Sequence, residues 1–148
     1  MQSPKKSLYS ESSAPPSQIE DLYQHTRTFR RIPKGYKAIH LHFSILDRLH
    51  KQPQHRRAIA TAFNKLLAPY EGKLFWMHNF DLFFISKGCP HTKLDQAKYN
   101  ALRAVDDSPV LKQIIDNSED DKICVWYDLA SEYDAFYKLV EQLRRNLA

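Results

Sequence analysis

Two histidines, His40 and His42, occupy alternate positions of an apolar run with strand character. Alternate residues of a strand point to the same face, so the two imidazoles would lie side by side. Neutral imidazoles at this spacing can bind zinc, and His78, near a predicted turn, could add a ligand. No cysteine or carboxylate is placed in the sequence to complete a tetrahedral set. We therefore expect ordinary histidines facing solvent or a helix, and no metal site.

A second pair of residues that could take part in catalysis is Cys89 and His91. They flank Pro90 and could supply a nucleophile and a base. Catalysis would require the two side chains to meet in space with an orienting third group, and adjacency does not supply that geometry. The other cysteine, Cys124, is far away and forms no CxxC motif. We expect a free thiol in a loop, no catalytic residue and a reducing compartment.

The length and composition of the chain fit one domain without a cofactor. The chain has 148 residues, a formal net charge of +5 and only three glycines, with no glycine-rich phosphate loop. No apolar run reaches the ~18 residues of a membrane span, and the N-terminus has no apolar signal core. These features predict a soluble, cytoplasmic protein.

Periodicity divides the chain into a tail and one α+β domain. Residues 1–16 are rich in Ser, Pro and Lys and predict a disordered tail, and 17–148 predict the domain. The hairpin strands are apolar at nearly every position, which indicates burial on both faces or a partner over the second face. The predicted elements are a helix over 17–30, a strand over 39–45, a helix over 55–70, strands over 73–78 and 82–86, a helix from 92, a short helix over 110–115, a strand over 122–129 and a helix from 131.

After the leading helix, the order is strand, helix, strand, strand, helix, strand, helix. This order, with its central hairpin, is typical of the ferredoxin-like βαββαβ fold. We expect an antiparallel sheet with helices on one face, plus extra N-terminal and C-terminal helices.

The turn of the hairpin reads "NFDLF", comprising Asn79, Phe80, Asp81, Leu82 and Phe83. In this context the segment 36–130 resembles the GGDEF domain family, the diguanylate cyclases, which share a ferredoxin-like core and place their signature at this turn. Asp81 and Phe83 match the signature.

The departures from the signature decide what the resemblance implies. In the family, the glycines let GTP approach the backbone and the glutamate helps to hold a divalent metal. Phe80 fills the place of the second glycine, and Leu82 has no oxygen to offer a hard cation. The first strand, "IHLHFS", has no carboxylate, and "YEGK" over 70–73 replaces the inhibitory RxxD motif. Asp81 remains as a residue that favours turns by bonding nearby backbone N–H groups, rather than as a metal ligand.

The resemblance therefore implies a domain without catalytic activity, cofactor or metal. Similar degenerate GGDEF-like domains occur in bacterial proteins ahead of a degenerate EAL-type domain, so an adjacent EAL-like domain is implied here. We expect an interaction or dimerisation module of a bacterial signalling or localisation protein. Its partner would be another protein or a second copy, with a homodimer expected.

Large apolar side chains supply the candidates for that interface. On the hairpin and the last strand, aromatic residues can serve as anchors. The last helix has an apolar stripe with steps of three and four, as in a helix-pairing seam. The candidate interface residues are Trp76, Phe80, Trp126, Tyr133, Phe136, Val140, Leu143 and Leu147.

The alternative function is nucleic-acid binding, with RNA as the expected ligand. Basic runs cover 27–37 and 48–57, and aromatic strands of a ferredoxin-like sheet can stack bases. The third strand, "DLFFISKG", is only partly similar to an RNP1 motif, and basic runs are usually solvated faces. We therefore expect a protein partner instead.

Overall fold

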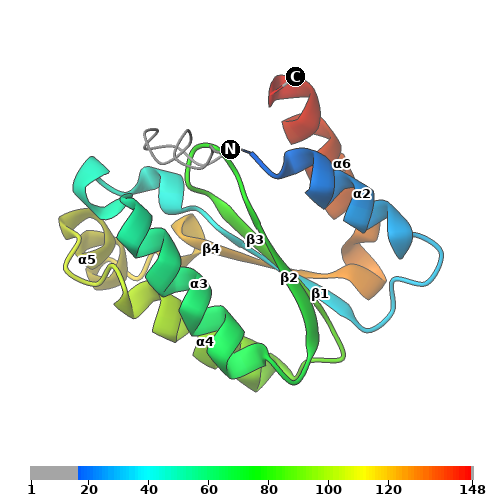
Figure 1. The fold of residues 1–148 in the computed structure, drawn as a ribbon, viewed down its shortest axis with the longest axis horizontal. Coiled ribbons are helices and arrows are strands. Elements are labelled where there is room, and N and C mark those ends of the chain that lie inside the picture. Colours follow the sequence, from blue (N-terminus) through cyan, green and yellow to red (C-terminus); the bar gives the residue numbers. More distant parts are fainter. Residues whose placement is uncertain (1–16, 148) are drawn as a thin grey trace, which may run out of the picture.

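In the computed structural model, which describes residues 17–147, a four-stranded antiparallel sheet separates two groups of helices (Figure 1). The strand order is β2-β3-β1-β4, which is the order of a ferredoxin-like sheet. The predicted α+β architecture with a βαββαβ core is confirmed. The strands are β1 (Tyr36–Leu41), β2 (Glu71–Trp76), β3 (Leu82–Lys87) and β4 (Cys124–Asp128). The predicted tail, 1–16, lies outside the described residues.

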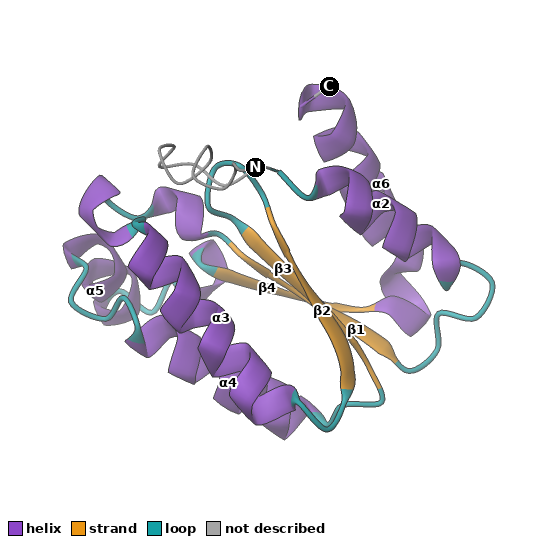
Figure 2. Cartoon of the chain, viewed as in Figure 1, coloured by secondary structure: helices purple, strands orange, loops and turns teal. Residues whose placement is uncertain are grey.

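Helices cover both faces of the sheet (Figure 2). On one face, α3 (Pro53–Leu67) packs beside α4 (His91–Arg103), and α5 (Pro109–Asp116) follows near the end of that layer. On the other face, α2 (Ile19–Thr28) packs against α6 (Leu129–Leu147). The helices of the βαββαβ core therefore lie on one face, as expected. The extra terminal helices, whose position was not predicted, cover the other face.

Apolar side chains on both faces of the strands explain why helices pack on both faces of the sheet. In β3, Leu82 and Phe84 point toward α3 and α4, whereas Phe83 and Ile85 point toward α2 and α6. All four side chains are at least nine-tenths buried. Of the two explanations for these apolar strands, burial within the domain is therefore correct, and no partner is needed over the second face.

The first strand ends earlier than its alternating pattern predicts. Beyond Leu41 the chain forms two short 3₁₀ helices, η2 (Phe43–Ile45) and η3 (Arg48–His50). The His42 N–H still donates to the Ile123 carbonyl at 2.8 Å, but the Ser44 N–H donates to a side chain of the hairpin turn. The backbone therefore leaves the sheet after His42, even though the apolar alternation continues.

Within residues 17–147, no helix has both the length and the apolar character needed to cross a membrane.

Candidate functional site

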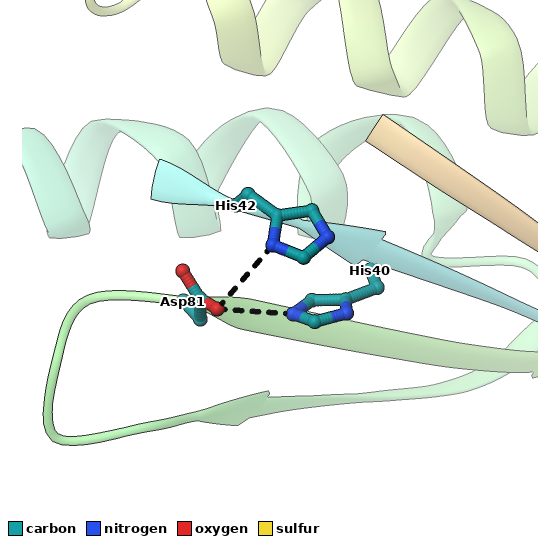
Figure 3. A group of neighbouring side chains, drawn as sticks. All are labelled: His40, His42 and Asp81. Carbon is teal, nitrogen blue, oxygen red and sulfur yellow. Dashed lines mark hydrogen bonds and ion pairs between the residues drawn. The ribbon is translucent and has the colours of Figure 1, made fainter. Parts of the chain in front are cut away.

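Three polar side chains meet at one end of the sheet, where β1 ends and β3 begins (Figure 3). In the antiparallel register, His40 pairs with Phe83 and Leu41 pairs with Leu82. The next step along both chains places His42 opposite Asp81. Since alternate residues share a face, His40, His42 and Asp81 lie on the face covered by α2 and α6.

Both imidazoles approach the same carboxylate oxygen (Figure 3). The His40 Nε2 lies 3.0 Å from the Asp81 Oδ2, and the His42 Nδ1 lies 3.7 Å from it. The two imidazole rings are 3.8 Å apart between centroids. The other carboxylate oxygen, Oδ1, accepts a hydrogen bond of 2.9 Å from the Ser44 N–H. We call these three residues the His–His–Asp cluster.

The cluster is buried on one side and open on the other. The His40 and Asp81 side chains are 6% and 11% exposed, whereas the His42 side chain is 32% exposed. Burial acts to raise the pKa of the Asp81 carboxyl, but hydrogen bonds from His40 and Ser44 outweigh it and hold that pKa below its ordinary value. Burial, together with the neighbouring His40, lowers the pKa of His42 against the opposing attraction of Asp81. At neutral pH, the cluster therefore presents a carboxylate at Asp81 and a neutral imidazole at His42.

The expectation that no carboxylate stands near these histidines is wrong, because Asp81 is brought in by strand pairing. The sequence also suggested that the Asp81 side chain bonds backbone N–H groups of its own turn, and the structure does not show this. Instead, the Asn79 Oδ1 accepts the Asp81 N–H at 3.0 Å, which leaves the Asp81 carboxylate free to reach across to β1. His78 is exposed and is not part of the cluster. The register of β1 against β3 is the information from which the position of Asp81 next to the histidines could have been predicted.

Of the other four residues in the 79–83 turn, three are buried and one is exposed. Phe80 has φ of 82°, is 3% exposed and packs edge-on against Trp76 with ring centroids 5.3 Å apart. Leu82 is fully buried. Asn79 is exposed, and Phe83 is stacked on His40 at 4.0 Å. The turn is therefore packed with apolar side chains at Phe80 and Leu82, the two positions at which the sequence departs from the motif it resembles.

Most of the interface candidates are used inside the domain. The buried ones are Trp76, Phe80, Tyr133, Phe136 and Val140. Tyr133 also donates its hydroxyl to the Thr26 carbonyl at 2.8 Å, which ties α6 to α2. Trp126 and Leu143 are half-buried, and the side chain of Leu147 is outside the described part. Their role as an interface stays a prediction, and only the half-buried members are open to a partner.

The cysteines are not arranged for nucleophilic chemistry. The Cys89 thiol is buried and donates to the Pro90 carbonyl at 3.6 Å, while His91 packs on Trp126 with centroids 4.5 Å apart. Burial raises the pKa of the Cys89 thiol, and it raises that of Cys124 to about 12. Both thiols are free and stay protonated at neutral pH.

A second histidine network, missed in the sequence, fixes the loop after β1. The His50 Nδ1 lies 2.6 Å from Asp47 and its Nε2 lies 3.0 Å from Asp107. Ser108, at the start of α5, donates to Asp47 at 2.7 Å. The hydrogen bond to Asp47 raises the pKa of His50 above its ordinary value, against the effect of burial. Since both ring nitrogens already face carboxylates, this network serves to join η3 to α5.

No protein-family model, curated protein or solved structure matches this chain. The resemblance to GGDEF domains therefore stays a hypothesis that depends on the turn residues and on the order of elements.

Proposed function

We propose that this chain is a non-catalytic GGDEF-like module that acts through protein contacts in a larger bacterial signalling or localisation protein. The observation that carries this proposal is the packing of the signature turn. Phe80 and Leu82 are both buried there, at the positions where the family needs open space and an oxygen ligand.

The chemistry of nucleotide binding explains why this packing matters. A triphosphate needs backbone N–H groups that it can approach closely, or cations that neutralise it. At this turn the Phe80 N–H donates to the Met77 carbonyl and the Met77 N–H donates to the Asp81 carbonyl, so both are engaged within the hairpin. A hard cation such as Mg²⁺ needs several oxygen ligands, and Leu82 supplies none. The domain is therefore proposed to have no cyclase activity.

The outer edge of α6 is the contact surface that we propose. Leu139 and Leu143 lie one turn apart and remain partly exposed after α6 has packed on α2 and the sheet. Charged pairs flank this edge, with Arg144 on Glu20 at 2.8 Å and Arg145 on Glu141 at 2.9 Å. An apolar edge with a charged rim suits pairing with the same edge of a second copy.

Light scattering at increasing chain concentration tests this pairing. We expect the mass to rise from that of one chain to that of two, and Leu143→Asp to weaken the dimer at least 10-fold, because a carboxylate would be desolvated in the contact. Ile32→Asp is the matched control, since Ile32 is 74% exposed outside α6, and it should leave the dimer unchanged.

A folding defect must be separated from a contact defect, because Leu139 and Leu143 both also pack against the domain core. Leu139→Lys, which changes the same edge with opposite charge, should weaken the dimer as well, and both variants should unfold cooperatively. A wild-type chain that stays monomeric at every concentration, or variants that pair as the wild type does, would contradict the proposed surface.

The nucleic-acid alternative receives no support from the sheet. Both of its faces are covered by helices, so the strand aromatics offer no open platform for stacked bases. In the first basic run, Arg27 lies over Tyr23 and Arg30 over Tyr137, which places these cations against the domain's own aromatic rings. We therefore do not propose this function.

A further inference from the structure

We infer that the His–His–Asp cluster is a binding site for one transition-metal ion of the zinc type. This inference goes beyond the contact function proposed above and does not depend on it. Among residues 17–147 it is the one group in which three such ligand atoms, from His40, His42 and Asp81, lie within 4.8 Å of one another.

The spacing of the ligand atoms fits a small ion. Zinc bonds of ~2.0–2.2 Å in a tetrahedron place neighbouring ligand atoms about 3.3–3.5 Å apart. The carboxylate oxygen of Asp81 lies 3.0 Å from the His40 nitrogen and 3.7 Å from the His42 nitrogen, on either side of that value. An ion could therefore replace the hydrogen bond between His40 and Asp81 with small side-chain shifts.

Two of the three ligands are already held in place by neighbours. The Ser44 N–H binds the Asp81 Oδ1, which leaves Oδ2 for the ion. His40 is stacked on Phe83 at 4.0 Å, with an interplanar angle of 20°, so its ring plane is fixed by packing. Neighbours that orient ligands in this way reduce the reorganisation that binding requires and are typical of metal sites.

The donor set and the exposure indicate which ion would bind and how it would enter. Two imidazole nitrogens and one carboxylate oxygen suit zinc, cobalt, nickel or copper, whereas magnesium and calcium prefer oxygen ligands alone. His42 is the open member of the cluster, and its exposed side leads to solvent. A water molecule could supply the fourth ligand from that side, as in zinc sites with three protein ligands.

The His50 network shows why proximity of His and Asp alone is not sufficient. There, the two carboxylates lie on opposite nitrogens of one ring, so no ion could contact all three groups at once. In the His–His–Asp cluster, both imidazoles converge on one oxygen.

Titration of the metal-free, untagged chain with Zn²⁺ in a calorimeter tests the inference, with Co²⁺ absorption as the report on coordination geometry. We expect one equivalent of zinc to bind and cobalt to give the intense visible bands of tetrahedral coordination. His42→Asn should weaken zinc binding at least 10-fold, since it removes a ligand that the fold exposes. His78→Asn is the control and should bind as the wild type does, because His78 is exposed and outside the cluster.

His42→Cys keeps the test informative if His42→Asn disturbs the fold, because a thiolate can replace the imidazole as a ligand. This variant should bind zinc and shift the cobalt bands through sulfur coordination. The inference is overturned if the wild type binds no zinc, if His42→Asn binds as tightly as the wild type, or if His78→Asn loses the same affinity. Any of these results would leave the dimer measurements unaffected.

Discussion

Replacing Phe136 with alanine is expected to lower the free energy of unfolding by about 3–5 kcal/mol, the usual cost of deleting a buried phenyl ring. Phe136 is fully buried in α6 and packs edge-on against Phe83 and Tyr127, at 6.0 and 5.1 Å between ring centroids. Its removal leaves a cavity between α6 and the sheet that these aromatic rings can only partly close. The midpoint of urea denaturation, with an unchanged slope, is the measurement that checks it.

Tyr99→Ala serves as the control for this substitution. Tyr99 is an aromatic residue of α4 that is 56% exposed, and its truncation should change stability by about 0.5 kcal/mol or less. If Phe136→Ala were equally mild and instead abolished self-association, Phe136 would be an interface residue, and α6 would not pack as described.

The second large effect is expected at Asp81. Asp81→Leu should lower the free energy of unfolding by about 2–4 kcal/mol. The loss of the acceptor costs roughly 1–3 kcal/mol at the buried donor and about 1 kcal/mol at the part-buried one. These donors are the Ser44 N–H and the His40 imidazole. Denaturation in the presence of a chelator measures this effect without any contribution from bound metal.

Asp81→Asn is the matched variant, since its amide oxygen can still accept the Ser44 N–H. It should lower the free energy of unfolding by less than Asp81→Leu does.

The lowered pKa of Asp81 adds a prediction on how stability depends on pH. A carboxyl whose folded pKa is depressed stabilises the protein above its unfolded pKa, and this stabilisation is lost as pH falls through the folded pKa. The wild type should therefore lose its advantage over Asp81→Asn in acid. An equal loss of stability in both variants, with no pH dependence, would exclude the carboxylate as the reason for the effect.

The sequence was sufficient to predict the fold because local periodicity determines the elements and their order. The central hairpin and the helices around it were placed within a few residues of their observed positions. The strand predicted over 39–45 runs past the observed end of β1 at Leu41. The alternation of apolar residues continues to Ile45 and does not show that the Ser44 N–H binds Asp81 instead of a strand.

The sequence could not distinguish a core helix from a pairing helix in α6. Tyr133, Phe136 and Val140 recur at steps of three and four, and both kinds of helix have this spacing. The packing of α6 on both α2 and the sheet shows that these side chains are buried within the domain.

The candidate site could not be predicted from the sequence for a different reason. His40 and Asp81 are 41 residues apart, and their contact depends on the register between β1 and β3. A change of register by one residue would turn Asp81 to the opposite face. The histidines could therefore be identified in the sequence, but the carboxylate that joins them could not.

We propose a function that depends on the turn at 79–83 being unable to hold a nucleotide. Its most direct test is a titration of the isotopically labelled chain with GTP and Mg²⁺, followed through the backbone amide resonances of residues 79–83. We predict that these resonances do not move, because Phe80 and Leu82 occupy the turn. Saturable shifts at this turn, together with formation of a cyclic dinucleotide, would contradict the claim.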